Sequence, residues 1–419
     1  MSMGRAGKFS IAMIIASLAA LFGTLVCGCG GGSATTTTTP TTPSTTSNVQ
    51  PISVTTGPAA AVGSPAVDIA FTSVTLCVPG STTQCQTIDG MLVDTGSSGV
   101  RVLASALTLS LPQHNDSSGN PIAECAEFED GESWGPVQAA DITMAGEKAS
   151  SAAIEVIGSP SFSNVPTSCS NLGPVEDDLA SFGANGIVGV GNFVQDCGDG
   201  CAVSVSGGQN LGLYYACPTT VCEVTSEPVA QQVSNPVAFF ASDNNGVIIE
   251  LPAASGSEAS LNGSMIFGIG TQSNNALGSA TVYTIDPNTG NFTTTFKGQT
   301  YTDAAFLDSG SNAIYFLDSR TTGIPTCTDL SFWYCAASTT NFSATNEGAN
   351  GATGTFNFSI GNADTLTSKL TNGVAADLGG PGFGPGTFDW GLPFFFGRNV
   401  YTAIEGRSTP GGQGPYWAY

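Results

Sequence analysis

Short apolar runs separated by turn residues dominate the chain from residue 51 onward. Residues 66–76 alternate imperfectly between apolar and polar positions, and 237–242 and 247–251 flank Asp243-Asn-Asn-Gly246, which predicts a hairpin. Further predicted strands lie at 91–93, 265–267, 281–285 and 355–360. Apart from weak patterns that begin at Ser181 and Ser226, no stretch keeps helical periodicity for a dozen residues. The pattern predicts an all-β protein with a few short helices.

Composition favours the same class. The chain has 419 residues, with 54 glycines and only 9 lysines and arginines, whereas helical bundles are rich in Ala, Glu, Lys, Leu and Arg. The length allows one large domain or two of ordinary size, each with its own core.

Charge and histidine content exclude several classes of function. A formal net charge of −23 repels phosphate backbones, so we expect no nucleic-acid binding. Because His114 is the single histidine, the chain has no HExxH motif and no multi-histidine metal site. A Ser-His-Asp triad would have to use His114. Calcium-like groups at Asp196 and Asp243 lack EF-hand spacing, and we expect neither a metal nor a cofactor.

The N-terminus has the pattern of an export signal. Arg5 and Lys8 precede an apolar stretch, 11–26, that is short for a membrane span. The following Cys27-Gly28-Cys29 resembles a bacterial lipobox, which implies a signal peptide at 1–28 and a lipid on Cys29, with Cys27 as the alternative. An ordinary secretory signal or an uncleaved anchor is also compatible with the pattern. No Asp follows either cysteine, which favours the outer membrane, at the cell surface or the periplasmic face, with the lipid as the only membrane contact.

A threonine- and proline-rich segment, 29–51, follows. Because it has almost no apolar residues to bury, we expect a disordered, extended tether.

The other ten cysteines indicate an oxidising compartment and five disulfides. Their spacing favours local bridges and leaves Cys125 to reach Cys169, although sequence alone does not determine connectivity. The candidates are Cys77, Cys85, Cys125, Cys169, Cys197, Cys201, Cys217, Cys222, Cys327 and Cys335. A zinc site built from the pairs 197/201 and 217/222 is the alternative.

The candidate chemistry lies in a near-repeat. Asp94-Thr95-Gly96-Ser97 follows one apolar strand, and Asp308-Ser309-Gly310-Ser311 follows another, 214 residues later. A single such triplet is uninformative, but two copies in the same context are specific. Two carboxylates placed face to face cannot both ionise easily, so they share a proton, and one acts as base while the other acts as acid.

These loops resemble those of the pepsin-like aspartic peptidases, a bilobal all-β family with one Asp-Thr/Ser-Gly loop per lobe. The segment 183–191 is similar to the one that crosses behind the first aspartate loop in that family, and 390–405 is similar to the family's last structural motif. The resemblance implies a double β-barrel with an active-site cleft between an N-terminal lobe, 52–232, and a C-terminal lobe, 233–419. It makes Asp94 and Asp308 catalytic, supported by Thr95, Gly96, Ser97, Ser309, Gly310 and Ser311. The whole chain also resembles a family of bacterial lipoproteins to which no activity is assigned.

The same resemblance assigns a flap hairpin to Phe128, Gly131 and Trp134. Phe128 stands where the family usually has tyrosine, and Trp134 is a candidate substitute. Asn312 and Pro393 are further departures from the family pattern.

Two functions remain open. The first is an envelope-anchored aspartic endopeptidase that hydrolyses peptide bonds through a water activated by Asp94 and Asp308. The second is an inactive pepsin-like scaffold that acts as a surface binding lipoprotein. We expect a monomer whose partner is a polypeptide substrate or a protein ligand. The peptidase hypothesis requires both carboxylates within reach of one water.

Overall fold

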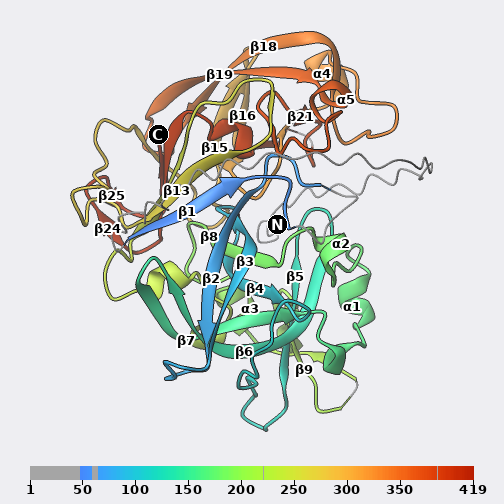
Figure 1. The fold of residues 1–419 in the computed structure, drawn as a ribbon, viewed down its shortest axis with the longest axis vertical. Coiled ribbons are helices and arrows are strands. Elements are labelled where there is room, and N and C mark those ends of the chain that lie inside the picture. The colour runs from blue at the N-terminus through green and yellow to red at the C-terminus, as the bar shows by residue number, and fades with distance from the viewer. Residues whose placement is uncertain (1–47, 59–64, 220, 385) are drawn as a thin grey trace, which may run out of the picture.

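The computed structural model describes residues 48–58, 65–219, 221–384 and 386–419. Two lobes built from strands lie one below the other in Figure 1, the lower one largely blue to green and the upper one largely yellow to red. The α-helices among the described residues have four residues each: α1 (Thr167–Ser170), α2 (Leu179–Phe182), α3 (Asp199–Ala202), α4 (Ser319–Thr322) and α5 (Ala363–Leu366). The predicted all-β, bilobal class is confirmed. The export signal, both candidate lipidation cysteines and most of the tether lie outside the described residues.

A closed ring of six strands forms the core of the N-terminal lobe. The order is β6–β7–β4–β8–β3–β2, and a pairing between β2 and β6 closes the ring. The strands are β2 (Ala70–Cys77), β3 (Cys85–Asp94), β4 (Ser98–Leu103), β6 (Glu132–Met144), β7 (Glu147–Ile157) and β8 (Gly186–Val190). Every residue of β4 and β8 is buried. Beyond β6 the sheet continues through β5 (Ile122–Glu127), β9 (Tyr214–Ala216) and β10 (Glu223–Val224).

The same sheet runs on to the C-terminal half of the chain. β1 (Val49–Val54) pairs with β2 on one side and, over all six of its residues, with β13 (Leu261–Phe267) on the other. The order then continues through β11 (Gly246–Leu251), β23 (Arg398–Ala403), β26 (Tyr416–Ala418) and β14 (Val282–Thr284). Backbone hydrogen bonds therefore join the two lobes. Since β1 begins at Val49, the last three residues of the predicted tether belong to the fold, because they complete this sheet.

A seven-stranded sheet forms the C-terminal lobe. Its order is β19 (Thr353–Asn362), β18 (Cys335–Glu347), β15 (Phe292–Phe296), β16 (Gln299–Leu307), β22 (Phe388–Trp390), β17 (Ile314–Phe316) and β21 (Gly379–Gly380). Its core is aromatic: the ring of Phe296 lies 5.6 Å from those of Phe316 and Phe342, in the tilted and edge-on arrangements that aromatic pairs prefer. Two small ladders complete the strands, namely β12 (Ser257–Glu258) with β20 (Val374–Ala375), and β24 (Ser408–Thr409) with β25 (Gly412–Gln413).

The predicted strand at 237–242 is wrong. Pro236–Phe239 forms the 3₁₀-helix η4, whose N-cap Asn235 accepts a hydrogen bond from the Val237 amide at 3.0 Å. Proline suits a first helical turn and cannot donate to a strand ladder, so this segment does not form a hairpin with β11. The weak helical patterns correspond only to α2 and to η3 (Val229–Gln231). The other 3₁₀-helices are η1 (Pro160–Phe162), η2 (Val205–Gly207) and η5 (Leu392–Phe394).

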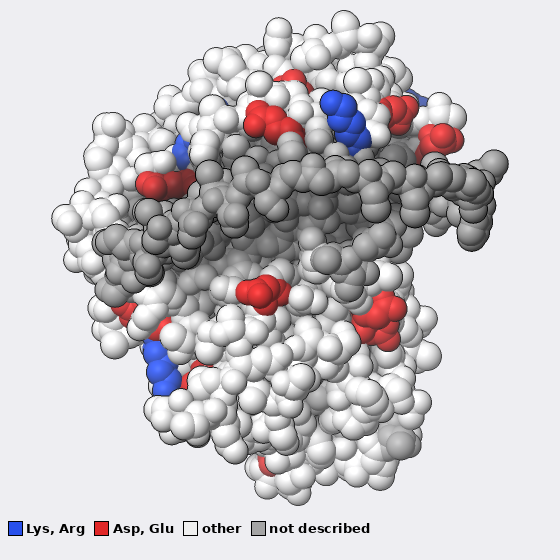
Figure 2. Space-filling model, viewed as in Figure 1, with Lys and Arg blue, Asp and Glu red and all other residues white. Residues whose placement is uncertain are grey.

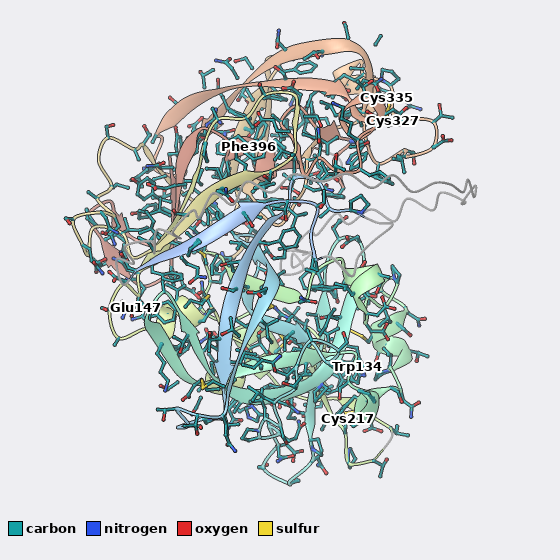
Figure 3. All side chains as sticks on the ribbon, in the orientation of Figure 1. Trp134, Glu147, Cys217, Cys327, Cys335 and Phe396 are labelled. Atoms are coloured by element: carbon teal, nitrogen blue, oxygen red, sulfur yellow. A yellow bond between two sulfur atoms is a disulfide. The ribbon has the colours of Figure 1, made fainter. Side chains whose placement is uncertain are left out.

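All ten cysteines of the folded part are paired. The bridges are Cys77–Cys85, Cys125–Cys169, Cys197–Cys201, Cys217–Cys222 and Cys327–Cys335. The expected pairing is confirmed, and the cysteines of the alternative zinc site are disulfide-bonded. Bridges occur in both lobes, as the labels Cys217, Cys327 and Cys335 mark in Figure 3. Within the described part of the chain, no helix has both the length and the apolar character needed to cross a membrane.

Charged groups are sparse on the face shown in Figure 2, yet they cluster inside the N-terminal lobe. Arg101 on β4 is 2% exposed and lies against three carboxylates. Its guanidinium contacts Glu124, Glu155 at 3.3 Å and Asp196 at 3.0 Å. Without this cation, the carboxyl groups of Glu124, Glu155 and Asp196 would be buried close together with no positive charge between them.

We predict that Arg101→Met lowers the free energy of unfolding by about 3–5 kcal/mol, because it leaves buried carboxylates without their cation. Lys148→Met is the matched control, since Lys148 also pairs with a carboxylate, Asp141 at 2.7 Å, but is 43% exposed. The control should lose about 1 kcal/mol or less. Urea unfolding at pH 7 measures both values, and equal losses would contradict this account.

Candidate active site

The two aspartate loops occupy equivalent places in a repeated three-strand unit. β3 ends at Asp94, β4 follows, and β8 lies between them, parallel to β3 and antiparallel to β4. In the C-terminal lobe, β16 leads to Asp308, and β22 lies parallel to β16 and antiparallel to β17. The segment expected behind the first loop is therefore β8, and β22 takes the equivalent place behind the second.

β8 and the end of β22 each pass so close to the neighbouring aspartate loop that only glycine fits at one position. A Cβ on Gly189 would lie 2.7 Å from the Ser97 hydroxyl, and one on Gly391 would lie 2.1 Å from the Ala313 carbonyl. Real Cβ atoms do not approach other atoms so closely, so a side chain at either position would push the aspartate loop out of place.

Four hydrogen bonds tie the loops to each other across the lobe boundary. The Thr95 amide donates to Ser309 Oγ at 3.1 Å, and the Ser309 amide donates to Thr95 Oγ1 at 3.0 Å. The two hydroxyls then donate to the carbonyls that precede the opposite aspartate: Thr95 to Leu307 at 3.2 Å, and Ser309 to Val93 at 2.8 Å. This nearly symmetric set holds the loops in a single relative position.

The carboxyl groups of Asp94 and Asp308 meet between the two loop glycines. A Cβ on Gly96 would lie 2.7 Å from Asp308 Cγ, and one on Gly310 would lie 2.7 Å from Asp94 Oδ1, so only glycine fits. The amides of Gly96 and Gly310 donate to the Oδ1 atom of their own loop's aspartate, at 2.6 and 2.7 Å. The same Cβ on Gly310 would lie 3.1 Å from Asp308 Oδ1, so the two Oδ1 atoms lie near the same point, close enough to share one water.

Burial raises the pKa of both carboxyls, which are 1% and 0% exposed. The pKa of Asp308 is raised further by the negative charges of Asp94 and Asp389. The pKa of Asp94 rises less, because its interaction with Asp308, the hydrogen bond from the Gly96 amide and the charge of Arg101 favour its ionised form. Burial and mutual repulsion therefore keep one proton on the pair at a pH at which an exposed aspartate has lost its own.

A cavity of about 390 Å³ opens beside the pair. Its walls include Gly96 and Ser97 from the first loop, and aromatic side chains from both halves of the chain: Phe193, Phe306 and Phe383. Glu129 is the one charged residue among those that line it. A cavity of this size with apolar walls and a few polar groups is typical of a ligand site.

The predicted flap residues lie in the hairpin of β5 and β6, but their side chains point into the lobe. Phe128 is 6% exposed and packs on Phe182, with ring centroids 6.4 Å apart. Trp134 donates to the Phe162 carbonyl at 2.7 Å and packs edge-on against Tyr215, so it does not replace the usual flap tyrosine. The neighbouring tip residue, Glu129, reaches the cavity instead.

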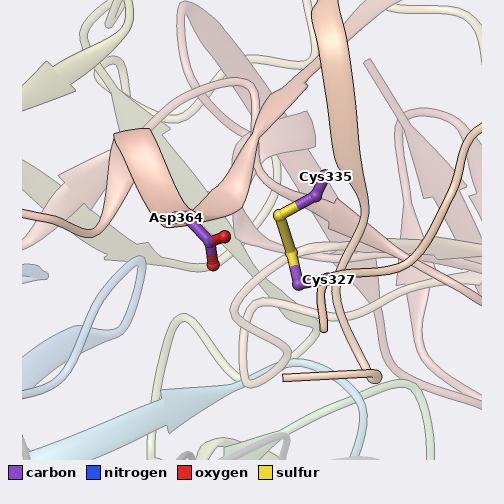
Figure 4. A group of neighbouring side chains, drawn as sticks. All are labelled: Cys327, Cys335 and Asp364. Atoms are coloured by element: carbon purple, nitrogen blue, oxygen red, sulfur yellow. A yellow bond between two sulfur atoms is a disulfide. The ribbon is translucent and has the colours of Figure 1, made fainter. Parts of the chain in front are cut away.

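One further cluster has the composition of a metal site. Among the residues that the structure describes, Cys327, Cys335 and Asp364 lie close enough to share an ion. Figure 4 shows that the two sulfurs are bonded to each other, so they offer no thiolate ligands.

The sequence reasoning missed Asp389, a third buried carboxyl next to the pair. It stands on β22 opposite Phe306, and its negative charge raises the pKa of Asp308. An alignment of β8 with β22 would have singled out this residue. Ile187-Val-Gly in β8 corresponds to Asp389-Trp-Gly at β22, so an acid replaces an apolar residue there.

We predict that Asp308→Asn raises the midpoint of thermal unfolding at pH 7 and leaves it unchanged near pH 4. The folded state holds a proton that the unfolded chain releases above about pH 4, so this carboxyl costs stability as the pH rises. Each unit of difference in pKa corresponds to about 1.4 kcal/mol. Asp89→Asn, an exposed substitution on the same strand as Asp94, is the control. If the unfolding midpoints of the parent and Asp308→Asn changed with pH by the same amount, the raised pKa of Asp308 would be contradicted.

Comparisons with known proteins bear on the whole chain. Residues 44–419 match the family described as "Protein of unknown function (DUF3443)". Comparison with curated protein sequences gave no match. Among solved structures, the chain is similar to an aspartic proteinase from Irpex lacteus, with a TM-score of 0.49 and 14% identity over 88% of this chain and 96% of that one. Because the family match covers most of its length, the protein belongs to the DUF3443 family.

Proposed function

We propose that this protein is an aspartic endopeptidase in which Asp94 and Asp308 share one proton and activate a water. The observation that carries the proposal is the close approach of two buried carboxyls held by matched loops. A structural protein gains nothing from this arrangement, since burying two acids together opposes folding at neutral pH. Hydrolysis by paired acid and base requires it.

The difference between the two carboxyls suggests their roles. Ionised Asp94 takes a proton from the water that attacks the peptide carbonyl carbon, while protonated Asp308 gives its proton to the carbonyl oxygen. A neutral diol results. Asp94 then protonates the amide nitrogen, the C–N bond breaks, and a diol hydroxyl returns its proton to Asp308. The products are a carboxylic acid and an amine, and the pair regains its starting state.

The cavity beside the pair supports a polypeptide substrate. Phe193, Phe306 and Phe383 offer apolar contact area for a side chain next to the bond that breaks. The first loop borders this cavity, and so do Phe306 and Leu307 at the end of the strand that leads to the second, so a peptide bound there would lie close to the pair.

We also propose that a lipid on Cys29 anchors the protein to the outside of the bacterial cell. The five disulfides are typical of proteins that fold outside the cytoplasm. The charged and apolar leader before Cys29 supports export, and the threonine-rich segment after it would hold the folded part away from the membrane.

We predict that Asp94→Asn and Asp308→Asn each abolish cleavage of a denatured protein substrate, because an amide cannot exchange the shared proton. The parent should be most active in acid and lose activity as its second carboxyl ionises. Cleavage is followed from pH 3 to 8, with and without a statine-containing inhibitor, and Asp89→Asn should match the parent. If the parent cleaves nothing in this range and both variants equal it in ligand binding, a non-catalytic binding scaffold is the better description.

We predict that Cys29→Ala abolishes labelling by radioactive palmitate in a bacterial host, whereas Cys27→Ala retains it. Globomycin, which blocks lipoprotein signal cleavage, should leave the parent unprocessed. Loss of the label in Cys27→Ala alone would move the lipid to Cys27. Absence of the label in the parent would favour an ordinary secretory signal.

A further inference from the structure

The two halves of the active site differ at one buried position. β8 and β22 are equivalent strands: Ile187 lies opposite Leu92 on β3, and Asp389 lies opposite Phe306 on β16. Ile187 is fully buried in an apolar cluster with Phe71, as the core of a barrel requires. The second lobe therefore places an acid where the first has a hydrocarbon.

Asp389 is poorly supplied with hydrogen bonds. The residue is 1% exposed, and neither carboxyl oxygen has a hydrogen-bond partner of normal geometry. A buried carboxylate without donors is costly, whereas a buried carboxylic acid needs only an acceptor for its proton. The surroundings of Asp389 therefore favour its protonated form.

Ser311 links this carboxyl to the pair. Its hydroxyl lies next to Asp389, and it donates its single proton to Asp308 Oδ2 at 2.9 Å. A hydroxyl whose proton is committed has only lone pairs to offer another neighbour. Ser311 therefore stands beside both carboxyls, and its single proton can serve only one of them at a time.

Burial raises the pKa of Asp389, and the Ser311 hydroxyl beside it lowers this pKa in part. The charges that act on it, Asp94 from the first loop and Glu129 from the hairpin tip, are both negative and raise its pKa further. On β17, Tyr315 faces it with a hydroxyl that donates to Asn312 at 2.7 Å, and burial keeps the pKa of this phenol well above its usual range. Asp389 in turn raises the pKa of Asp308.

We propose that Asp389 is a third carboxyl of this site, a positioning residue that is coupled to Asp308 through Ser311 and keeps the pair singly protonated to higher pH. Burial moves the ionisation of Asp389 to higher pH than that of an exposed aspartate. Ionised Asp389 then places a negative charge beside Asp308, and this charge opposes loss of the last proton there. The acid–base pair then persists in less acidic conditions than two carboxyls alone would allow. The effect on catalysis rests on the proposed peptidase function, whereas the proton coupling does not.

We predict that Asp389→Asn moves the alkaline limb of the pH profile of kcat/KM to lower pH by about one unit, because it removes a neighbouring negative charge. The acid limb should stay in place. Asparagine has nearly the shape of aspartic acid and retains a donor for Ser311. Asp377→Asn is the matched control: Asp377 is a partly buried acid of the same lobe that acts on Asp68.

A second measurement separates this inference from the peptidase proposal. The full chain is labelled with ¹³C at aspartate carboxyls, and the Asp308 and Asp389 signals are assigned by their loss in Asp308→Asn and Asp389→Asn. The pH at which the Asp308 signal is half-titrated should be lower in Asp389→Asn than in the parent, and it should be unchanged in Asp377→Asn. In Asp94→Asn the Asp389 midpoint should fall as well, which tests the coupling even if Asp389→Asn does not fold.

The outcomes are distinct. Shifted midpoints in a parent that cleaves no peptide support the coupling and count against the peptidase. An active parent whose Asp308 midpoint is the same with aspartate or asparagine at 389 overturns the role of Asp389 and leaves the peptidase standing. An Asp389 signal that titrates in the ordinary range of an exposed aspartate also overturns it.

Discussion

Two carboxyl groups buried face to face set the conditions that the rest of the structure has to meet. Each disfavours ionisation of the other, and burial adds to the effect. The loops would relax apart unless something held them, and the paired bonds between Thr95 and Ser309 do so across the lobe boundary. The continuous sheet through β1 and β13 fixes the lobes from outside, so the loops meet in one position.

The two lobes repeat a backbone plan but not its electrostatics. In the N-terminal lobe, Arg101 lies one strand beyond the first loop, and its charge favours ionised Asp94. In the C-terminal lobe, Asp389 lies beside the second loop, and its charge favours protonated Asp308. A symmetric backbone thus carries an asymmetric distribution of charge, with a cation acting on Asp94 and a further acid acting on Asp308. Arg101 supports the barrel and also acts on the site.

Local chemistry explains which expectations about the fold succeeded. The disulfides between cysteines four to eight residues apart need only a turn between their partners, so spacing was sufficient evidence. The segment at 237–242 has a strand's apolar residues, but Pro236 and the Asn235 cap start a 3₁₀ turn there. A hairpin at the expected place is formed by β5 and β6. The direction of Phe128 and Trp134 within it depends on the partners Phe182 and Tyr215, which lie far along the chain.

By itself the sequence determined the β class, the two aspartate loops and their glycines, and which cysteines were candidates for disulfides, because turn chemistry, strand periodicity and repeated motifs are local properties. Only the tertiary structure decided that Asp94 and Asp308 meet, that Glu129 reaches the cavity, and that Asp389 joins the pair. These contacts bring together residues separated by up to about three hundred positions, and a carboxyl's proton affinity depends on its burial and on neighbouring charge. Neither quantity exists until the lobes have packed.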